Sequence, residues 1–281
     1  MLRDKSFSLE VGQRHVHGVY RASETTGRRP TVIICHGFKG FMDWGFFPYL
    51  AELLAERGFC TVRFNFSGSG MSPGDEIVTD PEAFRTATFS KDLRELRAVL
   101  EAVGRTIAPN RADPERVAIL GHSRGGGTAL LAAADSESLR ALVTWAAVAT
   151  FDRMPAADRD RWRTAGEIPV VNARTGQELA IGSEVLDDLD DNAATLDLET
   201  AASRRSAPWL IVHGDEDETV PIAEARRLHQ AASEPAKLQS IRGASHTFGV
   251  GHPFRRPTPE LIEAMNETLR WLRRYVSADS S

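Results

Sequence analysis

A serine flanked by glycines stands near the middle of the chain, between a short apolar run and a stretch rich in helix-forming residues. Residues 116–120 (RVAIL) predict a buried strand, and residues 128–134 (TALLAAA) predict a helix. Between them Gly121, Ser123 and Gly125 form the pattern Gly-x-Ser-x-Gly. A sharp strand–turn–helix lifts such a serine hydroxyl clear of the sheet, and glycine tolerates the close backbone approach at the neighbouring positions. The predicted chemistry is nucleophilic attack by Ser123.

A serine hydroxyl needs a base within hydrogen-bond reach, and that base needs a third group to orient it. Polar groups in parallel sheets gather at the carboxyl ends of strands, which directs attention to the segments after two apolar runs, 207–214 and 236–243. His246 follows the second run directly, whereas His252 lies further along the same loop. Four carboxylates follow the first run and compete for the third role: Asp215, Glu216, Asp217 and Glu218.

Alternating strands and helices would have to hold these residues together. Two half-exposed strands at 6–11 and 15–22 predict a hairpin at the edge of a sheet. Further strands are predicted at 31–37, 60–66, 116–120, 139–149, 207–214 and 236–243, and helices at 46–56, 89–104, 222–232 and 259–275. This alternation favours an α/β fold with a mostly parallel, doubly wound sheet of eight strands and helices on both faces.

One long polar segment, residues 151–206, interrupts the alternation. It contains a hairpin-like stretch, IPVVNARTGQELAIG, followed by helical signals such as SEVLDDLDD. Insertions of this length in compact folds are more often functional than decorative, which favours a lid over a site. The expected organisation is a first core part at 1–150, a lid at 151–206 and a second core part at 207–281.

The composition is that of an ordinary globular protein, with 281 residues, 42% hydrophobic and 26% charged. A net charge of −5 argues against nucleic acid as a partner, and no apolar stretch is long enough to span a membrane. The N-terminus lacks the apolar region of a signal peptide, so the expected location is cytoplasmic. Cys35 and Cys60 lie in apolar runs and are expected as small buried residues rather than a disulfide. The oligomeric state stays open, a homodimer included.

Four motifs resemble those of the α/β-hydrolase superfamily of serine hydrolases: HGF at 36–38, GHSRGG at 121–126, GDEDETVP at 214–221 and GASH at 243–246. The family commonly writes its acid loop G-x-x-D-x-x-V-P, so the resemblance implies Asp217 as the acid. It also implies an oxyanion hole made by the backbone N–H groups of Phe38 and Arg124. The chain is most similar to bacterial carboxylesterases of the cinnamoyl/feruloyl type, although Ser245 stands where an acid more often precedes the histidine.

The resemblance implies hydrolysis of a small-molecule carboxylic ester through an acyl-enzyme, by a Ser123–His246–Asp217 triad that needs no metal or cofactor. Other chemistries of the fold, a serine aminopeptidase or thioesterase, remain alternatives, and so does a ligand-binding protein with little turnover. His36 is expected to hold the loop that presents Phe38, and the Arg124 side chain is expected to lie along the surface. The aromatic residues Phe38, Phe41, Trp44 and Phe47 are expected either in the core or on a pocket wall.

Overall fold

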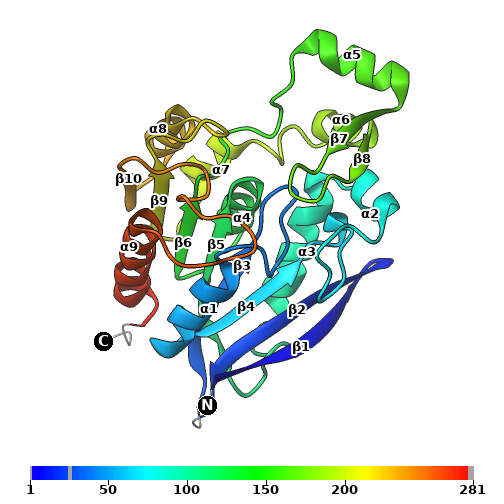
Figure 1. The fold of residues 1–281 in the computed structure, drawn as a ribbon. Coiled ribbons are helices and arrows are strands. Elements are labelled where there is room, and N and C mark those ends of the chain that lie inside the picture. Colours follow the sequence, from blue (N-terminus) through cyan, green and yellow to red (C-terminus); the bar gives the residue numbers. More distant parts are fainter. Residues whose placement is uncertain (1, 25–26, 278–281) are drawn as a thin grey trace.

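An eight-stranded sheet forms the centre of the molecule in the computed structural model, which describes residues 2–24 and 27–277 (Figure 1). Its strand order is β1-β2-β4-β3-β5-β6-β9-β10. β2 is antiparallel to β1 and β4, and all other neighbours are parallel, which confirms the predicted fold class. The strands are β1 (Leu2–Val11), β2 (Arg14–Ser23), β3 (Arg29–Cys35), β4 (Cys60–Asn65), β5 (Ala112–His122), β6 (Ala141–Trp145), β9 (Trp209–Gly214) and β10 (Ala236–Ile241).

The central strands are buried on both faces, as their continuous apolar runs predict. Along β3, Val32 and Ile34 face one hydrophobic cluster, whereas Ile33 and Cys35 face the other. This alternation follows from the two-residue period of a strand. Cys35 and Cys60 are both buried free thiols, in agreement with the expectation from their apolar surroundings.

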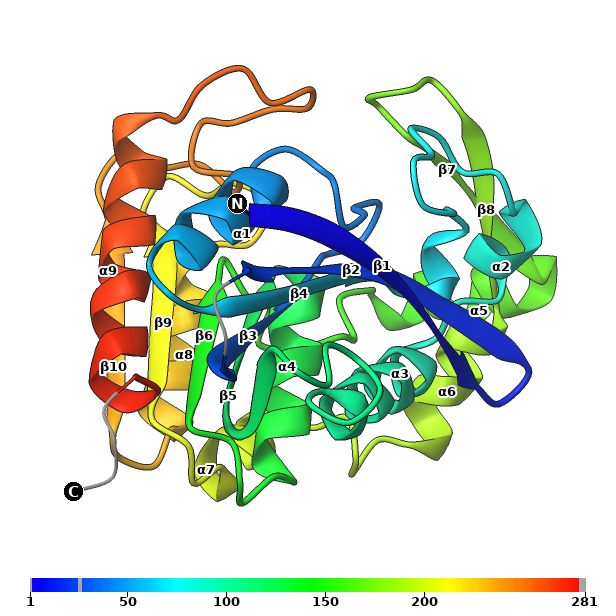
Figure 2. The same ribbon diagram turned by 90° about the horizontal axis from the view of Figure 1, so that it is seen from below.

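Helices cover both faces of the sheet (Figure 2). The helices α1 (Phe47–Glu56) and α9 (Pro259–Tyr275) pack on one face, with α9 beginning and ending where the sequence predicts. The opposite face is covered by α3 (Phe89–Ala102), α4 (Arg124–Ala134), α7 (Leu198–Arg204) and α8 (Ile222–Ala231). A 3-10 turn, η1 (Ser67–Ser69), and the short α2 (Pro81–Arg85) lie between β4 and α3.

The inserted segment between β6 and β9 folds largely outside these layers. It contains α5 (Ala156–Ala165), the antiparallel hairpin of β7 (Glu167–Val171) and β8 (Glu178–Gly182), and α6 (Glu184–Asp191). The hairpin and the helix that follows it appear at the predicted positions. Figure 1 shows α5 projecting from the body of the molecule beyond the carboxyl ends of the parallel strands. The last helix of the segment, α7, instead packs against α4 and α8.

Two predicted boundaries differ from the structure for local reasons. The strand predicted at 139–149 ends at Trp145, because Ala146 turns to a positive φ of 49°. The helix predicted at 89–104 ends at Ala102, because Val103 leaves helical geometry and Gly104 adopts a φ of 76°. The first break occurs inside an apolar run, where hydrophobic patterning alone gives no stop signal. The second is a shift of two residues at a helix end beside Gly104, whose residue type was the available stop signal.

None of the helices within residues 2–24 and 27–277 has both the length and the apolar character that crossing a bilayer requires.

Candidate active site

Ser123 occupies a strained turn between β5 and α4. Its φ and ψ of 56° and −123° are unusual for a residue with a side chain. The neighbouring glycines make the turn possible: a Cβ on Gly125 would lie 2.2 Å from the carbonyl oxygen of His36. A Cβ on Gly121 would lie 2.3 Å from the carbonyl oxygen of Gly125. The packing role expected for these glycines therefore has a geometric basis at both positions.

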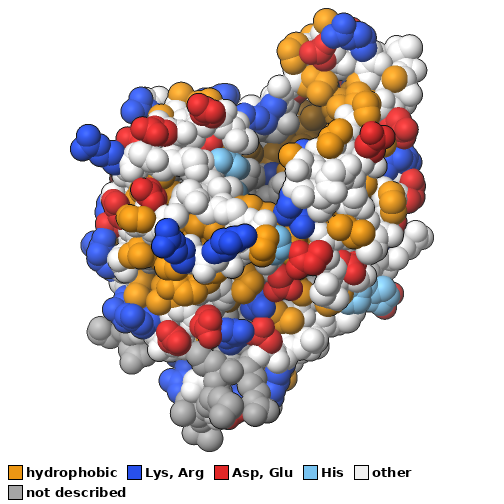
Figure 3. All heavy atoms as spheres, in the orientation of Figure 1, with side chains coloured by type: hydrophobic (Ala, Val, Ile, Leu, Met, Phe, Trp, Pro, Cys, Tyr) orange, Lys and Arg blue, Asp and Glu red, His pale blue; other side chains and the backbone are white. Residues whose placement is uncertain are grey.

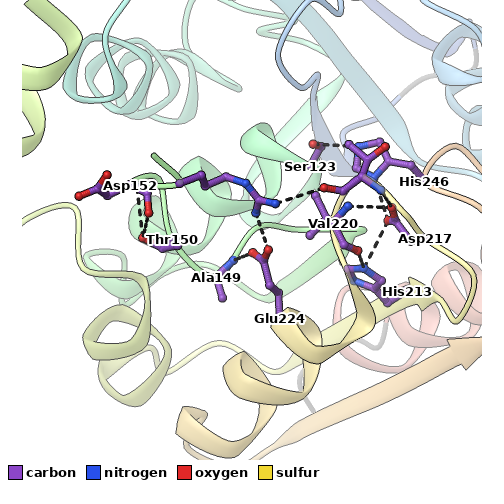
Figure 4. Close-up of polar contacts among 11 residues, drawn as sticks. Ser123, Ala149, Thr150, Asp152, His213, Asp217, Val220, Glu224 and His246 are labelled. Atoms are coloured by element: carbon purple, nitrogen blue, oxygen red, sulfur yellow. Dashed lines mark hydrogen bonds and ion pairs between the residues drawn. The ribbon is translucent and has the colours of Figure 1, made fainter. Parts of the chain in front are cut away.

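His246 lies beside the Ser123 hydroxyl, although 122 residues separate them in the sequence (Figure 4). The Ser123 hydroxyl donates to Nε2 of His246 over 3.0 Å. The loop after β10 carries His246, and its backbone is held from below by His122, whose Nε2–H donates to the carbonyl oxygen of His246 over 3.0 Å. Sequence analysis did not identify His122 as part of the site, although it is the first of the two variable residues of the Gly-x-Ser-x-Gly pattern.

Asp217 orients the imidazole from the other side. Nδ1–H of His246 donates to Oδ2 of Asp217 over 2.8 Å, and the carboxylate side chain is fully buried. Its other oxygen accepts hydrogen bonds from the backbone N–H groups of Thr219 and Val220, at 2.9 and 2.8 Å. Because an ionised carboxylate only accepts, the imidazole carries its proton on Nδ1 and presents Nε2 as an acceptor.

A second histidine, His213, lies under the carboxylate and was not singled out by sequence analysis. Its Nε2–H donates to the carbonyl oxygen of Val220 over 2.7 Å, and Oδ2 of Asp217 lies 3.4 Å from the same nitrogen (Figure 4). His213 ends the apolar run before the acid loop, directly before Gly214, and that position was the available signal.

The surroundings lower the pKa of three buried groups at the site, for different reasons. Burial raises the pKa of Asp217, but hydrogen bonds from His213, His246 and the Val220 N–H outweigh it and hold the pKa well below its usual range. Burial lowers the pKa of His122 to about 3 and that of His36 to about 4. The site therefore combines an ionised acid with two neutral supporting histidines at physiological pH.

The competing candidates lie elsewhere. Asp215 accepts a hydrogen bond from the Gly243 N–H, and Glu216 and Glu218 are exposed. His252 accepts a hydrogen bond from the Gly45 N–H through Nδ1, and its Nε2 lies 2.7 Å from Glu76. None of these four side chains contacts Ser123.

The segment after β3 packs against the turn that carries Ser123. A Cβ on Gly37 would lie 3.0 Å from the Cβ of Ser123, so this segment and the serine turn are in close contact. A turn closed by the Gly40 N–H on the Gly37 carbonyl presents Phe38 beside the serine. Arg124 is the first residue of α4, where a backbone N–H has no acceptor within the helix. Phe38 therefore belongs to the segment that packs against Ser123, and Arg124 follows Ser123 directly; their role as oxyanion donors stays a prediction.

His36 supports this segment. Its Nε2 accepts from the Phe66 N–H over 3.1 Å, and its Nδ1 lies 2.9 Å from the Gly37 carbonyl oxygen. The imidazole therefore ties the end of β3 to the end of β4, next to the turn that carries Phe38.

The Arg124 side chain does not lie along the surface as expected. Its guanidinium donates from Nη2 and Nε to Oδ2 of Asp92 on α3, at 2.6 and 3.0 Å, and lies 4.4 Å from the ring centre of Phe89. Burial raises the pKa of Asp92, an effect that Arg124 opposes. Asp92 and Glu95 are buried beside the apolar residues of α3. Carboxylates next to a buried helix face were the sequence signal that this face also makes polar contacts.

A cavity of about 530 Å³ opens from Ser123 toward the inserted segment. Figure 3 shows the corresponding hollow between the projecting segment and the body of the molecule, with hydrophobic side chains on its wall. Its apolar lining includes Phe89, Phe151, Trp162, Ile181, Leu186 and Phe38. Of the four aromatic residues considered from the sequence, Phe38 is 43% exposed and lines the cavity, Trp44 lies on the wall of a second cavity that also reaches Ser123, and Phe41 and Phe47 are buried in the core.

The donor set of the site is suited to proton transfer rather than metal binding. Within the part of the chain that the structure describes, no three His, Cys, Asp or Glu side chains are arranged to hold a metal ion.

The sequence matches a known protein family. The sequence model described as "Alpha/beta hydrolase family" matches residues 32–264. A monoacylglycerol lipase of Mycolicibacterium smegmatis is 24% identical to the chain, with 96% of each sequence covered.

Solved structures share the fold over nearly the whole chain. Est1E from Butyrivibrio proteoclasticus, with ferulic acid bound, has a TM-score of 0.73 at 21% identity, covering 97% of this chain and 100% of that one. The acylaminoacyl peptidase of Pyrococcus horikoshii has a TM-score of 0.69 at 19% identity, covering 100% of this chain and 42% of that one. The resemblance to esterases of the feruloyl type is thereby confirmed at the level of the fold.

Proposed function

The chain belongs to the alpha/beta hydrolase family, and we propose that it is a serine hydrolase that cleaves carboxylic esters through an acyl-enzyme intermediate. The observation that carries the proposal is the continuous line of hydrogen bonds from Ser123 through His246 to Asp217, at 3.0 and 2.8 Å. A protein that only binds a ligand has no physical need for a nucleophile, a base and an acid in this order.

The proposed reaction begins with proton transfer from the Ser123 hydroxyl to Nε2 of His246 as the serine oxygen attacks the ester carbonyl. The imidazolium that forms is stabilised by the ionised Asp217, which itself keeps no proton. His246 then gives its proton to the departing alkoxide, and the alcohol leaves. Water, deprotonated by the same nitrogen, attacks the acyl-enzyme and releases the carboxylic acid and the free Ser123 hydroxyl.

The backbone N–H groups of Phe38 and Arg124 are the proposed donors to the oxyanion of each tetrahedral intermediate. A single preorganised donor of this kind is worth about 3 kcal/mol of activation free energy, or a few hundredfold in rate. The strained turn at Ser123 and the ion pair between Arg124 and Asp92 fix one donor, and the turn at 37–40 fixes the other.

An apolar acyl or aryl group is the proposed occupant of the cavity above Ser123. We further propose that residues 151–206 act as its lid, since Trp162, Ile181 and Leu186 of this segment form part of the wall. Two of the relatives, a monoacylglycerol lipase and Est1E with ferulic acid bound, support a substrate with an apolar half.

The direct test is hydrolysis of p-nitrophenyl butyrate by the wild-type chain and by Ser123→Ala. We expect turnover by the wild type and loss of at least about a thousandfold in kcat for the variant, because the acyl-enzyme can no longer form. His252→Ala serves as the control, since this histidine contacts Gly45 and Glu76 rather than Ser123. Equal rates for wild type and Ser123→Ala would contradict the proposal.

Amide hydrolysis is the second candidate function, because the acylaminoacyl peptidase shares the fold. Aminoacyl anilides, measured beside the aryl ester, separate the two, and a higher kcat/KM on the anilide would favour the peptidase.

A further inference from the structure

Resting on the proposed function, we propose that the substrate is an ester that also carries a carboxylate, and that the ammonium group of Lys39 recognises this carboxylate at the mouth of the site. Lys39 follows Phe38, whose N–H is a proposed oxyanion donor. Lys39 and Ser123 line the same two cavities. The inference names a substrate class and a residue that selects it.

Lys39 lies where two cavities meet. It lines the apolar cavity of about 530 Å³ and also a second cavity of about 220 Å³ that likewise reaches Ser123 and His246. The second cavity is bounded by Trp44, Asn172, Arg174 and Thr247, and the described residues place no Asp or Glu on its wall. A substrate that fills both cavities would place an apolar group in the larger one. Its other group, in the smaller cavity, would lie beside positively charged side chains.

The other cations that line these cavities already have carboxylate partners. Nη2 of Arg124 lies 2.6 Å from Asp92, and Nη1 of Arg174 lies 3.6 Å from Glu76. Arg153 forms an ion pair with Glu224. These guanidinium groups are therefore largely neutralised within the protein.

Lys39 differs from them. Its Nζ donates to the carbonyl oxygen of Val171, at the end of β7, over 3.1 Å, and across residues 2–24 and 27–277 no Asp or Glu pairs with it. An ammonium group has three N–H donors, so two remain for a ligand. The Nζ atom lies 5.5 Å from the ring centre of Phe38, which helps to hold the charge above the site entrance.

The backbone at Lys39 provides a second, independent observation. Its φ of 57° lies in the left-handed region, where a residue with a side chain is strained and glycine is not. Strain of this kind is concentrated at functional sites, where the surrounding structure enforces it. Here the turn at 37–40 keeps a lysine at the position where glycine would fit without strain, which is consistent with a role for the side chain.

Two matched pairs of substrates test the proposal and locate the charge. In the first pair the carboxylate is in the acyl half: mono-p-nitrophenyl adipate against p-nitrophenyl hexanoate. In the second it is in the alcohol half: m-butyryloxybenzoate against m-butyryloxybenzamide. The measured quantity is the ratio of kcat/KM for the charged ester to kcat/KM for its neutral partner, for the wild type and for Lys39→Met, Lys39→Arg and the control Lys5→Met, an exposed lysine on β1.

We expect the wild type to favour the charged member of at least one pair. Lys39→Met should lower that ratio by about tenfold to a hundredfold, the effect of one hydrogen bond to a charged group. Lys39→Arg should keep most of the preference, and Lys5→Met all of it. The preference should also weaken as salt is added, because the carboxylate and the ammonium meet near the surface.

A wild type that favours the neutral ester in both pairs would overturn the inference, and so would a Lys39→Met ratio within about twofold of the wild-type ratio. Binding of the intact esters to Ser123→Ala and to Ser123→Ala/Lys39→Met, measured by calorimetry, separates this failure from failure of the proposed function. If the wild type hydrolyses none of the esters but Lys39 still governs the binding of the charged ones, the ester-hydrolase proposal fails and the recognition by Lys39 stands. If the charged and neutral esters bind equally, the inference is wrong.

Discussion

Both oxygens of the Asp217 carboxylate are occupied, and each has a different partner. Oδ1 accepts from the backbone of its own loop, at Thr219 and Val220, and Oδ2 accepts from Nδ1 of His246. The loop contacts fix the carboxylate in place, and the contact with His246 fixes the tautomer. Removing the charge should therefore impair the reaction more than it impairs the fold.

Asp217→Asn tests this separation. Asparagine can still accept from the loop N–H groups, but an amide facing His246 favours the wrong tautomer, so we expect kcat to fall by about a thousandfold to ten-thousandfold. The melting temperature should change much less than this loss of rate suggests. Asp215→Asn is the control, because Asp215 contacts Gly243 and not His246. A decrease in kcat of less than about tenfold for Asp217→Asn would argue against the role of the carboxylate.

Ser123 and His246 could be predicted from the sequence because each closely follows an apolar strand, whereas Asp217 was chosen among four carboxylates only because its loop resembles the family motif. Ser123, Asp217 and His246 meet in the structure as their positions after predicted strands suggest. His122 and His213 could not be assigned in the same way. Each donates to a backbone carbonyl, of His246 and Val220 respectively, and such a contact leaves no signature in residue type; His213 also lies 3.4 Å from Oδ2 of Asp217.

At the scale of elements, α3 and α4 are joined behind the proposed oxyanion hole. The ion pair between Arg124 and Asp92 connects the first residue of α4 to the first turn of α3, with only 16% and 6% of the two side chains exposed. Hydrophobic patterning predicted both helices but not this connection, because it pairs a residue of the serine turn with a carboxylate 32 residues earlier.

Asp92→Asn should weaken the connection between α3 and α4. Loss of the carboxylate leaves a mostly buried guanidinium without its partner, so we expect the free energy of unfolding to fall by about 2–4 kcal/mol. Urea denaturation measures this change. Asp135→Asn, which removes the exposed partner of Arg97 and Arg204, should cost less than about 1 kcal/mol. Equal losses for the two variants would mean that the buried pair has no special role.

The inserted segment is connected to the core by contacts between residues far apart in the sequence. The Lys39 contact with Val171 spans 132 positions, and Gln177 donates to the carbonyl oxygen of Val78 while accepting from its N–H, at 2.9 Å each. Sequence patterning predicted the hairpin and α6 within the segment. It could not predict which core residues the hairpin contacts, because Lys39 and Val78 belong to loops whose positions depend on the whole fold.

At the scale of the whole molecule, stability should depend on pH through a buried carboxylate on α3. Burial raises the pKa of Glu95 from 4.5 to about 7, with the charge of nearby Asp92 adding to the effect. Glu95 accepts hydrogen bonds from the N–H and hydroxyl groups of Ser67. Its folded-state pKa lies above its unfolded value, so the native state binds more protons in between, and stability is lost as the pH rises through about 7.

Glu95→Gln should remove this dependence. We expect its free energy of unfolding, relative to the wild type, to rise by about 2–3 kcal/mol between roughly pH 4 and pH 8. Using the difference between the two proteins cancels the opposite contributions of His36 and His122, whose lowered pKa values favour stability above their unfolded range. Glu101→Gln, on the exposed side of the same helix, is the control. Parallel curves for wild type and Glu95→Gln would rule out the shift.

The reactivity of a single alcohol underlies the proposed function. A fluorophosphonate probe reports it directly, since its phosphorus bonds to an activated serine oxygen and retains the adduct, with fluoride as the leaving group. We predict that intact mass and peptide mapping find one adduct on the wild type, at Ser123, and that His246→Ala slows its formation by at least about a hundredfold. An adduct that forms at the same rate on Ser123→Ala, or that maps to another residue in the wild type, would contradict the role of Ser123.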